Sequence, residues 1–239
     1  MVNVNLFCIP FAGGNRYSFL PLEKAIGSSL TTIPLDYPGR GTRYGEPLLK
    51  RLDVLCEDLF RQLAGKLQEP YAIYGHSMGG LLTYLLTKKI REEQLPLPVH
   101  LFISGSRAPS MRRDMPDYHQ LPRPQFIEKL RSLGGTTDEI LNSEEILELY
   151  EPILRADFEA VETYEYEACE PFNIPVTVFN GLSDRISREQ AEAWQRETTF
   201  PIVLREYPGG HFFILEHTTA IASLIVRNVY AGFSLKNTI

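Results

Sequence analysis

A serine at position 77 lies in a setting that favours nucleophilic chemistry. Residues Gly75–Gly79 read Gly-His-Ser-Met-Gly and fit the pattern G-x-S-x-G, with the short apolar run Tyr71–Tyr74 before them and an amphipathic stretch after them. A tight strand-to-helix turn here would hold the serine, in a strained conformation, at the carboxyl end of a sheet and above a helix N-terminus. Glycines two positions before and after the serine let the flanking backbones pack closely. The sequence therefore predicts that Ser77 is a nucleophile.

A serine nucleophile needs a base, and His211 is the best placed of the five histidines. It lies in the glycine-rich loop Gly209–Phe213, after the last predicted strand, from which an imidazole can reach the carboxyl edge of the sheet. The others fit less well: His76 adjoins the nucleophile, His100 lies in a predicted strand, His119 lies in a predicted helical insertion, and His217 borders the last predicted helix.

The acid that orients this base is predicted to be Asp184, in the loop that follows the apolar run Val176–Asn180. The order Ser77, Asp184, His211 along the chain is the order expected of an α/β-hydrolase. Asp184 could instead be a turn residue before the next helix. Asp157 is the alternative acid, although it lies in a helical pattern.

Two backbone N–H groups are predicted to stabilise the negative charge that develops on the substrate oxygen. One belongs to Met78, directly after the nucleophile, and the other to Phe11 in the loop Ile9–Gly14 after the first predicted strand. Ala12 could take the place of Phe11, and an ordinary Gly-Gly turn is the alternative interpretation. No metal ligands are predicted.

The elements that must position these residues alternate along the chain. Short apolar runs bounded by Gly, Pro, Asn or Asp predict strands at Val4–Ile9, Thr31–Leu35, Tyr71–Tyr74, Val99–Ser104, Val176–Asn180 and Ile202–Tyr207. Apolar periodicity and capping signals predict helices at Leu52–Leu67, Met78–Glu93, from Ser187 through Trp194, and about Thr219–Tyr230. This alternation predicts an α/β fold with a mostly parallel sheet flanked by helices.

One region, about 107–171, breaks the alternation, because no strand pattern occurs in it. Helices are predicted at Pro124–Leu133, after a capping box at Thr136–Glu139, at Ser143–Ile153 and at Ala156–Tyr164. We interpret this region as a helical lid inserted into a single domain of residues 1–239, because strand signals resume after Pro175. Two independent domains are the alternative.

Composition excludes several classes of protein. The chain has 239 residues, 44% hydrophobic, with 24 Lys and Arg against 30 Asp and Glu, for a formal net charge of −6. This is ordinary globular composition, and the acidic balance argues against a nucleic-acid binder. The N-terminus lacks the features of a signal peptide, and no stretch is long enough for a membrane span, so we expect a cytoplasmic protein. Cys8, Cys56 and Cys169 are expected to be unpaired.

Segments spread over nearly the whole chain carry a resemblance to a known family. They are Pro10–Gly14, Tyr37–Arg43 with Glu46 and Pro47, Gly75–Gly80, Ser104–Pro109, Leu133–Gly135, Leu154–Phe158, Phe179–Gly181 with Asp184, and Gly209–Phe213. Together they resemble the type II thioesterases, the stand-alone editing hydrolases of nonribosomal peptide and polyketide synthases. The Pro-Gly-Arg-Gly stretch and the insertion pattern distinguish this family from generic esterases.

The resemblance implies an α/β-hydrolase fold and hydrolysis of acyl groups from the phosphopantetheine thiol of acyl or peptidyl carrier proteins. The triad would act through an acyl-enzyme, and the lid would gate the acyl pocket. No cofactor is expected, since the substrate carries the phosphopantetheine. Carrier proteins would bind transiently to a monomer. Arg40 and Arg43 could contact a substrate phosphate or an acidic carrier, although loop arginines are more often solvated or in surface ion pairs.

Other functions remain as alternatives. One is a medium-chain acyl thioesterase that releases a fatty acid or polyketide product, and another is a small-ester or lipid serine hydrolase. A binding module built on a decayed hydrolase is a third, against which the intact Ser-Asp-His order argues. The insertion leaves about 175 residues for the hydrolase core and none for a carrier domain. We therefore expect the enzyme to act in trans.

Overall fold

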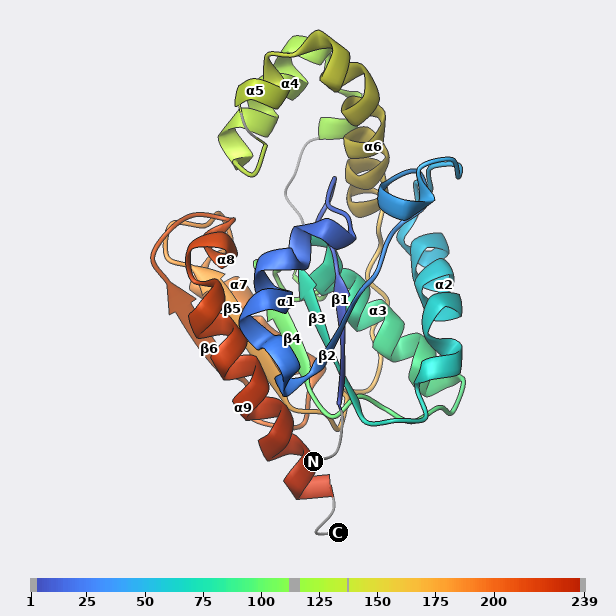
Figure 1. The fold of residues 1–239 in the computed structure, drawn as a ribbon, viewed down its shortest axis with the longest axis vertical. Helices are drawn as coiled ribbons and strands as arrows, with labels where there is room; N and C mark the ends of the chain where they lie inside the picture. Colours follow the sequence, from blue (N-terminus) through green and yellow to red (C-terminus); the bar gives the residue numbers. More distant parts are fainter. Residues whose placement is uncertain (1–3, 112–116, 137, 237–239) are drawn as a thin grey trace.

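A sheet of six parallel strands forms the centre of the protein, for which a computed structural model describes residues 4–111, 117–136 and 138–236 (Figure 1). The strands lie in the order β2-β1-β3-β4-β5-β6. They are β1 Asn5–Ile9, β2 Thr31–Pro34, β3 Tyr71–His76, β4 Leu101–Ser104, β5 Val176–Gly181 and β6 Val203–Tyr207. All six predicted strands are confirmed, and each boundary lies within two residues of the prediction.

Helices fill most of the connections between these strands. Their bounds are α1 Leu20–Ile26, α2 Leu52–Leu63, α3 Met78–Glu92, α4 Arg123–Leu133, α5 Asp138–Leu141, α6 Glu144–Glu162, α7 Arg188–Glu192, α8 Phe213–Glu216 and α9 Thr218–Lys236. The predicted capping box at Ser187 and Gln190 is present and opens α7. Sequence periodicity did not predict α1 or α8, because each has fewer than eight residues.

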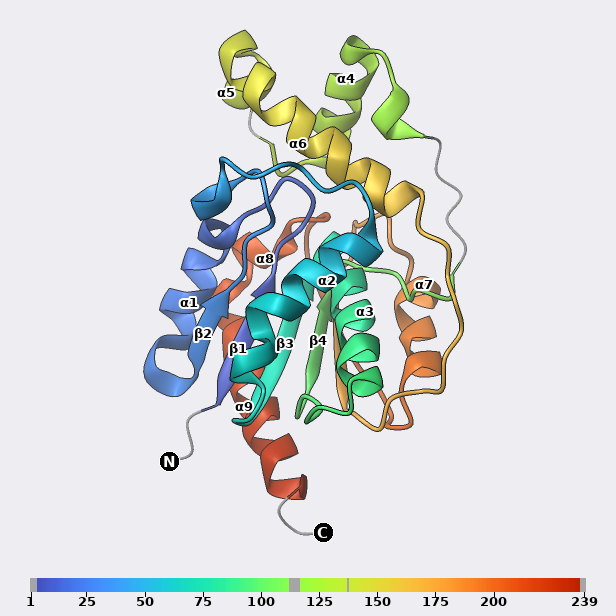
Figure 2. The ribbon, with the colours of Figure 1, turned by 90° about the vertical axis from the view of Figure 1, so that its right-hand side faces the viewer.

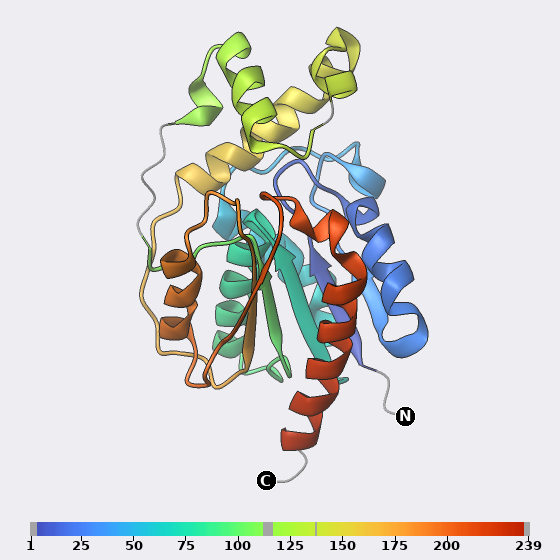
Figure 3. The same ribbon diagram turned by 90° about the vertical axis from the view of Figure 1, so that its left-hand side faces the viewer.

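Both faces of the sheet are covered, as parallel strands require. Along β1, Leu6 and Cys8 belong to the core cluster shared with α1 and α9, whereas Phe7 and Ile9 belong to the cluster shared with α2 and α3. Figures 2 and 3 show these two helical layers from opposite sides. Since every residue of β1 is buried, the run from Leu6 to Ile9 is apolar without alternation.

The residues between β4 and β5 form α4, α5 and α6, which lie across one end of the sheet (Figure 2). No strand occurs among the described residues of this helical insertion. It has an apolar cluster of its own, formed by Phe126, Leu130, Leu141, Leu147, Leu154 and Phe158. The predicted capping box at Thr136–Glu139 includes position 137, which lies outside the described residues.

The prediction of two helices at Ser143–Ile153 and Ala156–Tyr164 is wrong, because α6 runs without a break through Glu144–Glu162 and contains Pro152. An internal proline removes one helical hydrogen bond and typically costs about 3 kcal/mol. Leu147 before the proline and Phe158 after it pack into the same cluster of the insertion. This packing on both sides of Pro152 outweighs the local cost.

Among the described helices, none combines the length and the apolar character that crossing a bilayer would require.

Candidate active site

Ser77 occupies a strained turn between β3 and α3. Its φ and ψ are 56° and −115°, a conformation that residues other than glycine rarely adopt. A Cβ on Gly75 would lie 2.1 Å from the carbonyl oxygen of Gly79, and a Cβ on Gly79 would lie 2.1 Å from that of Ile9. Only glycine fits at these two positions, which explains the spacing of the motif.

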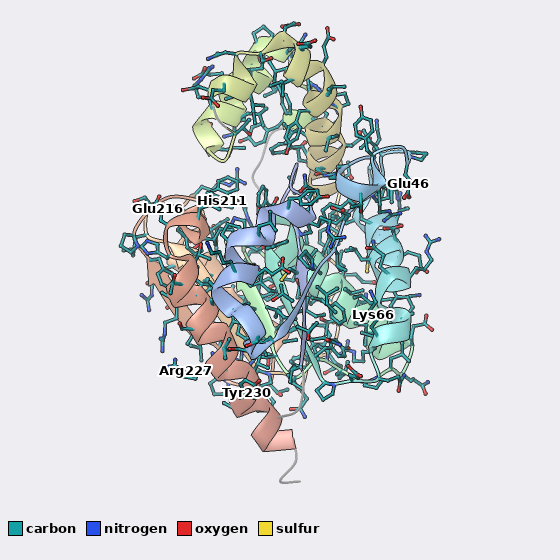
Figure 4. The ribbon with its side chains drawn as sticks, in the orientation of Figure 1. Glu46, Lys66, His211, Glu216, Arg227 and Tyr230 are labelled. Carbon is teal, nitrogen blue, oxygen red and sulfur yellow. The ribbon has the colours of Figure 1, made fainter. Side chains whose placement is uncertain are left out.

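The loops after β3, β5 and β6 bring Ser77, Asp184 and His211 into contact. His211 Nε2 lies 2.9 Å from Ser77 Oγ, and His211 Nδ1 lies 2.9 Å from Asp184 Oδ2. The side chain of Asp184 is fully buried and that of His211 is 8% exposed. Figure 4 shows His211 at the end of the core that faces the helical insertion.

The direction of these hydrogen bonds follows from the acid. An ionised carboxylate only accepts hydrogen bonds, so the Nδ1–H of His211 donates to Asp184. The other ring nitrogen, Nε2, is then free to accept the hydroxyl proton of Ser77. This arrangement is able to remove a proton from the serine hydroxyl as it attacks a carbonyl carbon.

His76 is fully buried beneath His211, with 5.0 Å between the ring centroids. Its Nδ1 lies 3.0 Å from Ser104 Oγ, so it points away from the nucleophile as its sequence position predicts. Burial lowers the pKa of His76 well below the usual histidine value, and the proximity of His211 lowers it further. A neutral, buried ring therefore packs against the base.

The loop after β1 forms a tight turn, Phe11–Gly14, beside Ser77. The N–H of Gly14 donates to the carbonyl of Phe11 at 2.8 Å, and Gly13 has a φ of +78°, as the third position of a type II turn requires. The N–H groups of Phe11, Ala12 and Met78 donate to no described residue. Both predicted alternatives for the second oxyanion donor, Phe11 and Ala12, therefore stay open.

A cavity of about 110 Å³ opens over Ser77, between the sheet and the helical insertion. Its wall from the core includes Phe11, Met78, Arg185 and His211, and its wall from the insertion includes Leu130, Leu133, Gly135, Ile140, Tyr150, Leu154 and Phe158. The lining is mostly apolar, which suits an acyl chain. Sequence reasoning did not identify the insertion residues of this lining.

Phe212 fills the junction between the two walls. Its ring packs against Phe11, at a centroid distance of 5.0 Å, and lies next to His211. A Cβ on Gly135 would lie 2.1 Å from Phe212 Cε2. Gly135, in the Leu133–Gly135 segment that carries the resemblance, therefore leaves room for this ring.

Asp157, the alternative acid, does not contact His211. Its carboxylate forms an ion pair with Arg40 and accepts the N–H of Gly13 at 2.7 Å. Arg43 is also paired, with Glu46 and Asp58. The guanidinium groups of Arg40 and Arg43 are therefore both paired with carboxylates of the protein, Arg40 in a buried ion pair.

The described residues offer one group of side chains that resembles a metal site, Asp117, His119 and Glu162. The carboxylate of Glu162 already accepts the N–H groups of Tyr118 and His119, together with a contact to His119 Nδ1 at 2.6 Å. These bonds account for the proximity of His119 and Glu162. The cysteines Cys8, Cys56 and Cys169 are unpaired, as predicted.

Comparison with known proteins gives a consistent result. A family model described as Thioesterase domain matches residues 4–229. The gramicidin S biosynthesis protein GrsT of Aneurinibacillus migulanus is 37% identical over 214 residues, which cover 89% of this chain and 84% of that protein.

Two solved structures share the whole architecture. RedJ, a thioesterase from the prodiginine biosynthetic pathway in Streptomyces coelicolor, superposes with a TM-score of 0.89 at 33% identity, over 95% of this chain and 91% of that one. YbtT, a type II thioesterase from the yersiniabactin NRPS/PKS biosynthetic pathway, superposes with a TM-score of 0.86 at 26% identity. The match covers 97% of this chain and 94% of YbtT. These neighbours confirm the predicted α/β-hydrolase fold.

Proposed function

Because this chain belongs to the thioesterase domain family, as a type II thioesterase of the kind found in NRPS/PKS pathways, we propose that it hydrolyses acyl thioesters on the phosphopantetheine arm of carrier proteins. The observation that carries the proposal is the continuous hydrogen-bonded series from Ser77 through His211 to Asp184, at the base of an apolar cavity. Clearance of blocked or misprimed carriers, in trans and by a monomer that binds them transiently, is part of the same proposal.

In this mechanism Ser77 Oγ attacks the thioester carbonyl carbon while His211 Nε2 accepts the hydroxyl proton. The N–H groups of Met78 and of Phe11 or Ala12 donate to the oxyanion of the tetrahedral intermediate. The carbon–sulfur bond then breaks, and His211 gives the proton to the departing pantetheine sulfur, which leaves as the thiol. Water, deprotonated by His211, cleaves the acyl-enzyme and restores the serine. Asp184 stabilises the imidazolium that forms in both halves of the reaction.

The helical insertion is assigned the role of a lid over the acyl pocket. Its residues form one wall of the cavity above Ser77, so an acyl chain in that cavity would be shielded from water on both sides. The proposed mechanism includes no cofactor, because Ser77 makes the first attack, water makes the second and His211 transfers the protons.

A Ser77→Ala variant tests the assignment of the nucleophile. We expect loss of acyl-carrier thioester hydrolysis by more than about 10³-fold, with an unchanged free energy of unfolding, because Oγ contacts only the reacting groups. A fluorophosphonate probe should label wild-type protein at Ser77 and leave the variant unlabelled. Turnover at the wild-type rate in purified Ser77→Ala protein would refute the triad.

Substrate class is tested by comparing acetyl-, medium-chain acyl- and aminoacyl-carrier proteins with the same acyl groups on coenzyme A and with small esters. The proposal requires the highest kcat/KM on carrier-bound thioesters. Preference for medium-chain acyl groups with slow turnover of short ones would favour the product-releasing alternative. Preference for free esters would favour a general serine esterase.

A further inference from the structure

Asp157 of α6 is the centre of a buried contact that joins three segments distant in sequence. Its side chain is fully buried, and that of its partner Arg40 is 3% exposed. Both guanidinium Nη atoms of Arg40 donate to the carboxylate, one of them at 2.8 Å. A third donor, the N–H of Gly13, lies 2.7 Å from Asp157 Oδ2. The carboxylate therefore connects α6 to the loops that follow β2 and β1.

Side chains of α6 bind both the N–H and the carbonyl of Gly13. The hydroxyl of Tyr150 donates to the Gly13 carbonyl at 2.5 Å, while Asp157 accepts the Gly13 N–H. Between these contacts, a Cβ on Gly13 would lie 2.5 Å from Leu154 Cδ2. Three successive turns of α6 thus contact the same residue of the Phe11–Gly14 turn.

The loop after β2 supports this turn from a second side. The hydroxyl of Tyr37 donates to the carbonyl of Pro10 at 2.7 Å, and the Arg40 guanidinium lies 5.1 Å from the centroid of the Tyr37 ring. Pro10 directly precedes the turn. Rotation of the Phe11–Gly14 turn would therefore break contacts with both α6 and Arg40's own loop.

Stability alone does not explain a buried ion pair of this kind. Removal of two charges from water costs about as much as their attraction returns, and apolar pairs of similar volume are often as stable. A carboxylate that accepts a backbone N–H does something an apolar pair does not do, since it fixes the orientation of that peptide group. Oxyanion stabilisation depends on such orientation, because the donors must lie at hydrogen-bond distance from the position that the oxyanion will occupy.

We infer that Asp157 is a positioning residue. It holds the Phe11–Gly14 turn so that the N–H of Phe11 or Ala12 donates to the oxyanion, while Arg40 neutralises the buried carboxylate. The inference rests on the proposed function, because it assigns Asp157 an effect on the oxyanion formed at Ser77. The two parts of the insertion then have different roles. Helix α6 supports the catalytic residues, whereas α4 and α5 cover the cavity.

The test compares Asp157→Asn with Asp58→Asn. Asp58 is a matched control, because it is also an acid paired with an arginine of the same loop, Arg43, but it does not contact the turn. The concentration of active enzyme is measured by labelling Ser77 to completion with a fluorophosphonate. kcat, KM and the inhibition constant of a substrate-like trifluoromethyl ketone are then determined per active site, together with the midpoint of chemical unfolding.

We expect Asp157→Asn to lower kcat per active site by roughly 10- to 100-fold and to change KM by less than about threefold. Inhibition by the trifluoromethyl ketone, whose adduct carries an oxyanion, should weaken in proportion to kcat/KM. Asp58→Asn should change neither kcat nor the inhibition constant of the trifluoromethyl ketone by more than about twofold. If both variants show the same kcat per active site as wild type, Asp157 has a structural role only and the inference is wrong.

Two further variants cover the case in which Asp157→Asn does not fold. Tyr150→Phe removes only the bond to the Gly13 carbonyl, and we expect a several-fold loss of kcat at constant KM. Arg40→Lys keeps the positive charge and should retain more activity than Arg40→Met. Equal activity of Tyr150→Phe and wild type, together with equal activity of Arg40→Lys and Arg40→Met, would overturn the inference. Activity in Ser77→Ala would instead overturn the proposed function itself.

Discussion

Individual side chains at the proposed site have properties that their neighbours impose. Ser77 keeps a positive φ because Gly75 and Gly79 allow the backbones around it to approach closely. His211 has a defined pair of hydrogen bonds because Asp184 is buried and only accepts. The same principle applies outside the site, where burial changes the titration of a histidine and so the response of the whole fold to acid.

His100 provides a residue-scale prediction about pH. Its ring stacks on Phe102 with 4.3 Å between centroids, its Nε2 lies 2.8 Å from Thr177 Oγ1, and burial lowers its pKa to about 4. The unfolded chain binds a proton at His100 below about pH 6.5, whereas the native state does not do so until about pH 4. The native state should therefore lose roughly 3 kcal/mol through this group as pH falls from 7 to 4.

Urea unfolding at a series of pH values measures this effect. The free energy of unfolding of His100→Gln should fall less steeply between pH 7 and 4 than that of wild type. Thr177→Val is the control, because it removes the hydrogen-bond partner but keeps a buried histidine, so its slope should match wild type. A wild-type slope in His100→Gln would contradict the prediction.

At the scale of elements, the ends of parallel strands and one helix of the insertion form the site together. The loops after β1, β3, β5 and β6 meet at one edge of the sheet, as the parallel order requires. The described part of the loop after α4, residues 134–136, lines the cavity beside Phe212. The fit between this loop and the Phe212 ring determines how the insertion rests on the catalytic edge.

Alanine substitutions in the α4–α5 loop test that fit. Gly134 and Gly135 both have positive φ, of 70° and 80°, so Ala is strained at either position. Only at Gly135 does the added Cβ meet the Phe212 ring, at 2.1 Å, whereas at Gly134 the nearest atom is 3.9 Å away. Because the ring also packs on Phe11 and His211, its displacement should lower kcat/KM of Gly135→Ala by at least about tenfold.

Steady-state kinetics on an acyl-carrier thioester provides the measurement. The kcat/KM of Gly134→Ala should fall by less than about threefold, since its added Cβ strains the backbone but does not collide with the Phe212 ring. In a Phe212→Ala background, the additional effect of Gly135→Ala should shrink to that of Gly134→Ala. An undiminished effect in that background would show that the ring contact is not the cause.

The whole molecule carries a net charge of −6, and this charge bears on its proposed partner. The loop arginines Arg40 and Arg43 are both paired with carboxylates, so their positive charges are neutralised locally. An acidic carrier protein would therefore approach a surface of the same overall sign. Recognition would depend on the acyl-pantetheine arm in the cavity rather than on long-range attraction.

The salt dependence of kcat/KM tests whether the net charge of the chain repels an acidic carrier protein. We expect kcat/KM for an acyl-carrier protein to rise by about twofold between 50 and 500 mM NaCl, because salt screens the repulsion. The same acyl group on free pantetheine, which is uncharged, serves as the control and should respond little. A marked fall of kcat/KM with salt for the carrier alone would mean that a local basic surface attracts it.

The sequence was sufficient for features that depend on neighbouring residues. Apolar runs and their boundaries predicted all six strands, and the spacing of Gly75, Ser77 and Gly79 predicted the strained turn, because turn geometry and strand burial constrain residue types locally. Ser77, Asp184 and His211 could be chosen from the sequence because each one follows a predicted strand. That these three side chains would be in contact required only the assumption of a parallel sheet.

Only the tertiary structure decided the contacts between segments that lie far apart in the chain. Arg40 and Asp157 are 117 residues apart, and nothing local distinguishes a loop arginine that is buried from one that is solvated. The continuity of α6 through Pro152 and the fit of Phe212 against Gly135 depend in the same way on what packs beside them. Residue patterns determine which elements form, whereas the environment of a charge or a ring is determined by the packing of those elements.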